Sequence, residues 1–415
     1  MQCHDAGARS LGCEGAGMGG VRMQQLAGSV LAVIFIDLGF RVWIVNAPRH
    51  PALVLLSIAA YLCAFVAVRG VFDAPRRWLE IVYPVLCLVG VLVGFAAQGV
   101  HSDVIGGYAS DALAFDHYSA QLLLSGRDPY GADMTPAYAA FHVPRSMVTP
   151  TTSGGTVTVQ SYPALAFLVY APFVLAHVGS MLWVNVALLF VAILLAYALV
   201  PPENRIAIGL IVVAVQEFVY FATGAVTDIV WVVPMIAVAA LWDESPEWAA
   251  VWFGVACAIK QDAWFVVPFA LLHWRSTRTA GILAAAFLIP NLPFIIWNPQ
   301  AWVMGVLAPL VTHPVPFGSG FVQLLASGLL PASAALLALP WILAFLLCLY
   351  LYVRDAAKYH WLPFIAPAVV LFFAPRSLAN YFLYWPLIAI VYASARLHRQ
   401  GDPSFPERRR SEGGV

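Results

Sequence analysis

The chain has 415 residues, of which 62% are hydrophobic and only 10% are charged, and its mean hydropathy is +0.83. Soluble domains carry about 25% charged residues, so this composition excludes an ordinary soluble protein and predicts an all-α, polytopic membrane protein. The formal net charge of zero argues against a nucleic-acid partner, because nucleic acids are held by many cationic contacts to phosphate.

The first residues are rich in glycine and show no hydrophobic periodicity, so we expect residues 1–25 to form a disordered cytoplasmic tail. Cys3, His4 and Cys13 lie in this tail without the paired CxxC or HxxxH spacing of a metal site. We therefore assign no metal to the protein. The other cysteines lie in apolar stretches and predict no disulfide framework.

Apolar stretches of ~20 residues, the length that crosses a bilayer, recur along the rest of the chain. They predict a transmembrane helical bundle of about twelve spans, interrupted by one large loop at residues 99–161. Three spans precede the loop within residues 26–98: 26–45, 51–68 and 79–98. The others lie within residues 162–395: 162–178, 181–200, 206–222, 225–241, 248–274, 280–297, 331–353, 361–373 and 378–395.

Lys and Arg concentrate in the cytoplasmic loops of membrane proteins, which gives the orientation. The basic loops carry Arg69, Arg76, Arg77, Arg275, Arg278, Arg354 and Lys358. With these loops and a basic tail at residues 396–415 in the cytoplasm, both termini lie inside. Three segments then share the extracytoplasmic face of the cell membrane: residues 99–161, 298–320 and 374–377.

The loop at residues 99–161 is the most informative segment, because connections inside compact domains usually have only ~4–6 residues. Ser110 is positioned to cap a helix whose first turn holds Asp111, and Gly126 with Pro129 ends it. One face of this amphipathic helix joins a carboxylate to apolar side chains: Asp111, Phe115, Tyr118 and Leu122. We expect the helix to lie on the membrane surface with its apolar face down.

Three further motifs follow this helix in order. The turn after it reads Gly126-Arg127-Asp128-Pro129-Tyr130, and Tyr162-Pro163 opens the next span. Gly254-Val255-Ala256-Cys257-Ala258-Ile259-Lys260 is followed by Pro268, and a last segment reads Phe373-Ala374-Pro375-Arg376-Ser377-Leu378-Ala379-Asn380-Tyr381. This series resembles the GT-C membrane glycosyltransferases, and most closely the polyprenyl-phosphate-dependent mannosyl- and arabinosyltransferases of glycosyltransferase family 87. The sequence departs from the family in the two extra spans before its large loop, and in lacking a Gln within residues 223–228.

The resemblance implies an extracytoplasmic enzyme without a cofactor. Its partners would be membrane lipid, a polyprenyl-phosphate donor of mannose or arabinofuranose, and a lipid-linked or cell-wall-linked glycan acceptor. An acceptor hydroxyl would attack the anomeric carbon while lipid phosphate leaves, which requires a base near the acceptor and cations near the phosphate. By the family pattern the base is Asp111, with Asp116 as the alternative. Asp111 could instead serve only the helix dipole, worth ~0.3–1 kcal/mol.

The candidate ligands of the donor phosphate are basic side chains: Arg376, Lys260, His117 and His313. Arg376 and His117 also suit interfacial anchoring, and Lys260 could pair with Asp262 within an otherwise apolar stretch. Asp37 and Arg41 stand one turn apart and predict a structural pair. The candidate substrate-binding side chains are Tyr118, Tyr130, Asn380, Tyr381 and Tyr384.

Two other functions fit the same composition. A polytopic lipid or solute transporter, including a flippase, also buries charged side chains in helices, although the two halves of this chain show no internal repeat. A non-catalytic membrane assembly partner is a third possibility. The acidic helical loop favours the enzyme over both.

Overall fold

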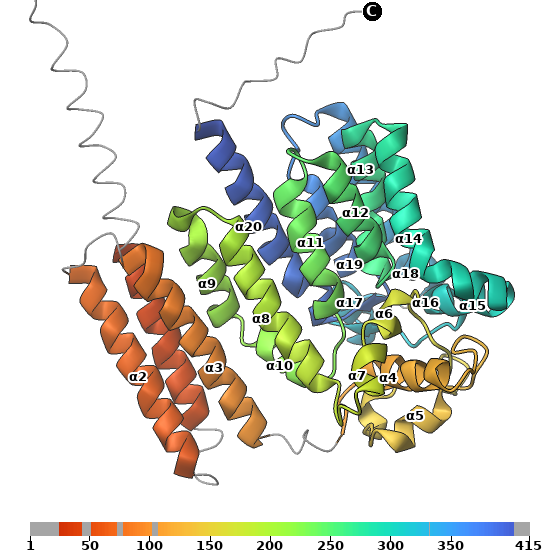
Figure 1. The fold of residues 1–415 in the computed structure, drawn as a ribbon, viewed down its shortest axis with the longest axis horizontal. Coiled ribbons are helices and arrows are strands. Elements are labelled where there is room, and N and C mark those ends of the chain that lie inside the picture. The colour runs from red at the N-terminus through yellow and green to blue at the C-terminus, as the bar shows by residue number, and fades with distance from the viewer. Residues whose placement is uncertain (1–24, 44–50, 73–77, 102–106, 332, 402–415) are drawn as a thin grey trace, which may run out of the picture.

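A computed structural model describes residues 25–43, 51–72, 78–101, 107–331 and 333–401 of the chain. Their regular secondary structure is almost entirely helical, as the sequence predicts (Figure 1). The strands that they contain are β1 (Phe317–Gly318) and β2 (Arg376–Ser377), which pair in parallel. The predicted tail residues 1–24 and 402–415 lie outside the described residues. Residues 396–401, which we assigned to the basic tail, instead continue the last helix.

The N-terminal helices pack together at one side of the molecule (Figure 1). They are Gln25–Trp43, α2 (Pro51–Phe72), the π-helical turn η1 (Trp78–Val82) and α3 (Tyr83–His101). Their buried side chains, such as Phe35 and Tyr83, form a hydrophobic cluster of their own, which Val213 joins. The predicted pair is confirmed on the exposed face of the first helix, where Arg41 Nε lies 2.7 Å from Asp37 Oδ2.

The large loop contains α4 (Asp111–Leu124), α5 (Thr135–Ala140) and the 3₁₀ turn η3 (Arg145–Met147). The helix signals of α4 are confirmed: the Ser110 side chain accepts a hydrogen bond from the Ala112 amide at 3.0 Å, and Gly126 follows the helix with φ of +75°. The buried side of α4 differs from the face we predicted, because it includes Leu113, Asp116 and Ala120. Since several elements pack on α4, it has no single apolar face turned to lipid.

The remaining elements form the main helical body. In chain order they are α6 (Leu165–Leu168), α7 (Ala171–Leu175), α8 (Leu182–Leu199), η4 (Pro202–Asn204), α9 (Arg205–Ala214), α10 (Glu217–Thr223), α11 (Ile229–Leu241), α12 (Pro246–Cys257), η5 (Gln261–Val266), α13 (Val267–Trp274), α14 (Thr277–Trp297), α15 (Pro299–Val306), α16 (Ala308–Val311), α17 (Val322–Ala326), α18 (Ala334–Arg354), η6 (Leu362–Phe364), α19 (Ala366–Phe373) and α20 (Ala379–Gly401).

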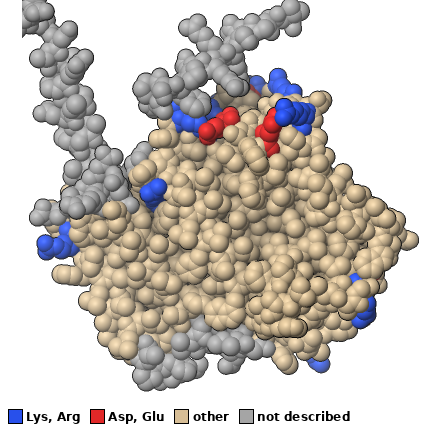
Figure 2. All heavy atoms as spheres, in the orientation of Figure 1, with Lys and Arg blue, Asp and Glu red and all other residues tan. Residues whose placement is uncertain are grey.

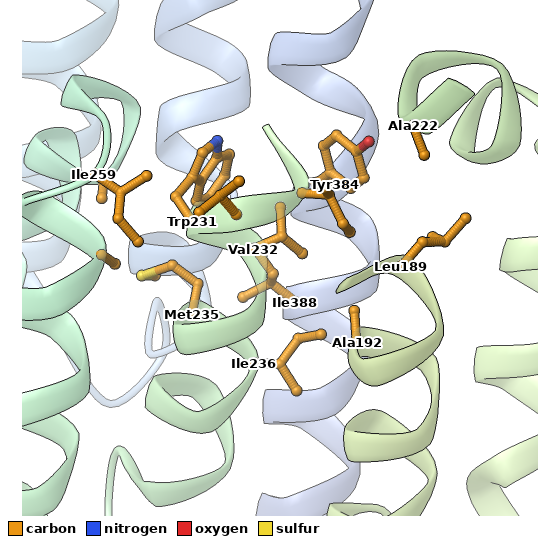
Figure 3. Packing of buried hydrophobic residues seen from close by; sticks show 14 of the residues in the cluster. Leu189, Ala192, Ala222, Trp231, Val232, Met235, Ile236, Ile259, Tyr384 and Ile388 are labelled. Atoms are coloured by element: carbon orange, nitrogen blue, oxygen red, sulfur yellow. The ribbon is translucent and has the colours of Figure 1, made fainter. Parts of the chain in front are cut away.

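Helix α11 occupies the centre of this body. It is apolar around its whole circumference, and a helix with that pattern is stable only when other elements cover every side. It packs against α8, α12 and α20, and Figure 3 shows its side chains Trp231, Val232 and Met235 among those of the neighbouring helices. This packing fixes the position of the residues that precede α11, which become important for the candidate site.

The several long apolar helices indicate a multi-pass membrane protein. Among the described residues, five helices are long and apolar enough to cross a bilayer: Gln25–Trp43, Leu53–Phe72, Leu182–Leu199, Thr277–Trp297 and Ala335–Arg354. A sixth span exists if Arg205–Ala214 and Glu217–Thr223, which meet at 65°, count as one. The prediction of about twelve spans is therefore not reproduced by the helices that the structure describes.

Breaks in predicted spans account for part of the difference. Residues 162–178 form the short helices α6 and α7, residues 248–274 are interrupted between α12 and α13, and residues 361–373 hold only η6 and α19. Proline contributes to these breaks: Pro172 and Pro363 each stand at the start of a helix, where the missing amide proton is harmless. Hydropathy over a window does not register such interruptions.

The two ends of the molecule differ in how many charged side chains they expose. The exposed basic residues at the ends of α13 and α18 and in the segments just after them are Arg275, Arg278, Arg354 and Lys358. Figure 2 shows charged atoms gathered mainly at that end, with a broad uncharged band below them. The loop helices α4 and α5 lie at the opposite end (Figure 1). The predicted orientation would place this charged end in the cytoplasm.

Candidate functional site

The three segments predicted to share one face do come together at the α4 end. Thr151 forms an antiparallel bridge with Pro314, which joins the large loop to the segment after α16. Phe317 and Gly318 then pair with Arg376 and Ser377, the turn between α19 and α20. Backbone pairing thus links three segments that lie far apart in the sequence, and it places polar side chains from them beside each other.

Asp111 lies in the first turn of α4 and is half-buried. The backbone amide of Thr149 donates a hydrogen bond to Asp111 Oδ2 at 3.0 Å. The guanidinium of Arg376 approaches the same threonine from the other chain segment, with Nη2 3.5 Å from Thr149 Oγ1. A carboxylate and a guanidinium therefore flank a single residue, and both retain access to solvent.

Asp116 lies one and a half turns further along α4 and is fully buried, with 0% of its surface exposed. Gln160 Nε2 donates a hydrogen bond to its Oδ1 at 2.8 Å, while its Oδ2 has no hydrogen-bond partner of good geometry among the described residues. Burial raises the pKa of Asp116 to about 7, although Gln160, Lys260 and Thr227 each favour the ionised form. The second candidate base is thus enclosed, and only the first can touch an acceptor without rearrangement of the protein.

A second group of buried charged and polar side chains lies where α11, η5 and α20 begin. It consists of Asp228, Lys260, Asp262 and Asn380. Lys260 Nζ lies 2.6 Å from Asp228 Oδ1 and 3.5 Å from Asp262 Oδ2. Asn380 Nδ2 donates to Asp228 Oδ2 at 2.6 Å, and Trp231 Nε1 donates to Asp228 Oδ1 at 3.0 Å.

Two tyrosines cover the ammonium of this cluster. Lys260 Nζ lies 5.4 Å from the ring centroid of Tyr162 and 5.1 Å from that of Tyr381, within the range of cation–π attraction. The predicted pairing of Lys260 with Asp262 is confirmed, but Asp228 is the closer partner. Two carboxylates and two aromatic rings already surround Lys260, so the geometry favours Arg376 over Lys260 as the ligand of a phosphate.

A local break in the helical backbone creates the position of Lys260. Helix α12 ends at Cys257, and Lys260 is extended, with φ of −149° and ψ of 146°, before η5 begins. Gln261 Nε2 stabilises the break by donating to the carbonyl oxygens of Ser161 and Val306, both at 2.7 Å. Irregular backbone inside a membrane protein is tolerated where protein groups satisfy it, as they do here.

The other predicted site residues lie in or against the helical core. Asn380 belongs to the buried cluster, and the Tyr381 ring covers the ammonium group of that cluster, as described above. Tyr130 and Tyr384 are core residues: Tyr130 Oη donates to the Tyr162 carbonyl at 2.8 Å, and the Tyr384 ring packs edge-on against Phe218. Tyr118 is half-buried against the main core.

The two histidines lie apart from the buried cluster. His117 is buried, and its Nδ1 is 2.8 Å from Tyr108 Oη. Burial lowers the pKa of His117 to about 4, so the side chain is neutral near pH 7 and offers no charge to a phosphate. His313 is exposed and has φ of +46°, and its carbonyl accepts the Thr152 amide at 3.0 Å. This backbone contact helps to hold the large loop and the segment after α16 together.

Sequence analysis missed the contribution of Asp228, Gln160 and Thr149. Asp228 had a signal, since an acidic residue directly before the apolar run 229–241 is costly to bury and needs a partner. Gln160 and Thr149 have no such signal, because polar residues are ordinary in a loop. Among the residues that the structure describes, no group of three or more His, Cys, Asp or Glu side chains is arranged to hold a metal ion.

Comparison of the chain with models of known protein families, with curated proteins and with solved structures finds no match. The functional argument therefore rests on the geometry of the residues themselves.

Proposed function

We propose that the protein is an integral membrane glycosyltransferase that transfers a sugar from a polyprenyl-phosphate donor to a lipid-linked or cell-wall-linked glycan. The sequence likeness to family 87 favours mannose or arabinofuranose as the sugar. In this proposal the active site lies at the α4 end, on the extracytoplasmic side of the cell membrane.

The observation that carries the proposal is the arrangement around Thr149. Asp111 and Arg376 flank this residue, at 3.0 Å from its amide and 3.5 Å from its hydroxyl oxygen. Sugar transfer from a lipid phosphate needs both groups at close range, because a proton is lost from the acceptor while negative charge develops on the leaving phosphate. Guanidinium suits the phosphate, since its fork of donors matches two phosphate oxygens.

In the proposed reaction Asp111 accepts the proton of the acceptor hydroxyl. The acceptor oxygen forms the new bond to the anomeric carbon as the bond from that carbon to the phosphate oxygen breaks. Arg376 stabilises the phosphate as it leaves with the bonding electron pair. The buried cluster around Asp228 has a positioning role, because it ties the starts of α11, η5 and α20 together beneath the loop.

The test is transfer of radiolabelled sugar from polyprenyl phosphate by the purified full-length protein. Asp111→Asn keeps the size of the side chain and its position in the first turn but removes the base, so we expect turnover to fall by ~10²–10⁴. Asp133→Asn is the matched control: Asp133 is exposed in the same loop and accepts the Thr135 amide at 3.0 Å, which asparagine can also do. Normal turnover in the Asp111→Asn variant would refute the proposed base.

A transporter is the second candidate, and discontinuous helices favour it. The bend of 65° between α9 and α10 and the break before η5 lie in the main helical body, and broken helices of this kind form the substrate sites of transporters. Vesicles that contain the purified protein and fluorescent polyprenyl phosphate, without acceptor, separate the two functions. Movement of intact lipid across the bilayer without sugar transfer in any assay would favour transport.

A further inference from the structure

A cavity of about 420 Å³ opens beside α4, away from the Asp111 site. Its volume falls within the ~300–1,000 Å³ typical of small-molecule sites. It is lined by residues of α4, by residues at the C-terminal end of α5 and by the turn between α7 and α8. Asp116 and His117 are neighbours on α4, and they point to different surroundings: Asp116 contacts Gln160, whereas His117 lines this cavity.

The lining is polar, and its ionisable side chains are those of tyrosine and histidine. Six of its twelve residues have side chains that can hydrogen-bond: Tyr108, His117, Gln121, His142, His177 and Ser180. None of the twelve is Asp, Glu, Lys or Arg. A phosphate or carboxylate would find no fixed cation here, and a hydrocarbon chain would leave the polar groups without partners.

Hydrogen bonds hold His117 in the cavity wall. The Met181 amide donates to Tyr108 Oη at 3.0 Å, and the same oxygen lies 2.8 Å from His117 Nδ1. Gln121 Nε2, an amide nitrogen that can only donate, lies 3.4 Å from His117 Nε2. Two neutral polar groups, the Gln121 amide and the His117 imidazole, therefore meet at the cavity.

An aromatic surface completes the site. Phe141 stacks with His117 at a centroid distance of 4.4 Å and with Tyr108 at 5.0 Å. Those two rings are only 5.9 Å apart, so they do not sandwich Phe141 between opposite faces. Phe141 lines the cavity and remains half-exposed.

We propose that this cavity binds an uncharged sugar ring, with hydroxyl groups on Gln121, His117 and the rim histidines and an apolar ring face against Phe141. Sugars are ligands that present several neutral hydroxyls together with an apolar face, which is what this lining can satisfy. Gln121 lies ten residues after Asp111, or ~15 Å along the helix axis. Use of the cavity for a non-reacting unit of the acceptor rests on the proposed function, whereas sugar binding itself does not.

Glycine 179 provides a way to fill the cavity. Gly179 lines it, and a Cβ added there meets nothing within 4 Å, so Gly179→Trp can occupy the cavity without a backbone clash. Gly281 is the matched control, because it is exposed near the start of α14 and its added Cβ also meets nothing within 4 Å. Gln121→Ala removes one polar contact from an exposed position.

The experiment is saturation-transfer NMR of methyl α-mannopyranoside and methyl α-arabinofuranoside with the purified full-length protein, without donor lipid. We expect transfer to at least one glycoside in wild type and in the Gly281→Trp variant, loss in Gly179→Trp, and at least a twofold weaker signal in Gln121→Ala. An unchanged signal in Gly179→Trp, or no signal from either glycoside in wild type, would overturn the proposal. The same measurement on Asp111→Asn reports on binding alone, so failure of the proposed transfer reaction would not be mistaken for failure of this site.

Discussion

Replacement of Lys260 by methionine tests whether the buried cluster holds the α4 end together. Lys260→Met keeps an unbranched apolar stem but leaves Asp228 buried without its cation. Removing one partner of a buried pair typically costs ~3–5 kcal/mol in the free energy of unfolding. Trp231 and Asn380 still donate to the Asp228 carboxylate, so we place the cost near the lower value, ~3 kcal/mol. The double variant Lys260→Met with Asp228→Asn removes the carboxylate closest to the lost ammonium and leaves Asp262 as the remaining carboxylate without its cation, so it should recover part of the loss.

Thermal unfolding in detergent, followed by loss of the monodisperse protein, measures this effect. At ~2.1 cal/mol/K per residue, a loss of ~3 kcal/mol in a chain of 415 residues corresponds to a fall of about 3–4 °C in the apparent Tm. Lys358→Met is the matched control, because Lys358 is exposed at the charged end and should change the Tm by little. If Lys260→Met unfolds at the wild-type temperature, or if the double variant is no more stable than the single one, the cluster does not have the structural role argued here.

Three further predictions address the phosphate ligand, the buried carboxyl and the orientation. Arg376→Ala should raise the KM for the donor more than Arg376→Lys, because lysine keeps a point charge but loses the fork; equal kinetics in both variants would reduce Arg376 to an interfacial anchor. Asp116 has a raised pKa of about 7 in the folded protein, so the free energy of unfolding of wild type falls as the pH rises from about 4 to about 7. Above that range the contribution of this carboxyl changes no further. Asp116→Asn removes this titration, and its Tm advantage over wild type should therefore widen between pH 5 and pH 8; a constant difference would contradict the buried, protonatable carboxyl. Cysteines introduced at Ala132 and Ser319 should react with impermeant thiol reagents on intact cells, while one at Ser276 should not, and labelling of Ser276 alone would reverse the orientation.

Helix α4 could be predicted because its signals are local. A capping serine, an acidic first turn and a glycine after the last turn all lie within one short stretch, and each acts through hydrogen bonds or dihedral angles of its own segment. The meeting of the large loop with residues 298–320 and 374–377 could also be predicted, because the distribution of basic residues constrains which loops share a face. The distribution of basic residues does not predict which backbone segments pair, such as β1 with β2, because that pairing depends on contacts between residues far apart in sequence.

The broken helices could not be predicted from hydropathy. An average over a window of apolar residues treats residues 248–274 as one span, although the chain turns at Lys260. The turn depends on Gln261, whose partners are backbone carbonyls of Ser161 and Val306. Neither partner can be identified from sequence spacing. The sequence marked Lys260 as costly to bury, but it did not identify Asp228 as its main partner.

The positions of the carboxylates separate two explanations for acidic residues at the α4 end. Asp111 stands in the first turn of α4 and Asp228 directly precedes α11, so the dipoles of these helices favour both negative charges by ~0.3–1 kcal/mol each. Asp116 receives no such benefit, because it lies in the middle of α4. Its burial beside Gln160 costs stability above its raised pKa, and a helix dipole does not explain why an acid rather than an amide occupies that position. Asp111→Asn and Asp116→Asn therefore address different questions. The first asks whether an accessible carboxylate does chemistry, and the second asks whether the enclosed one is retained at the expense of stability.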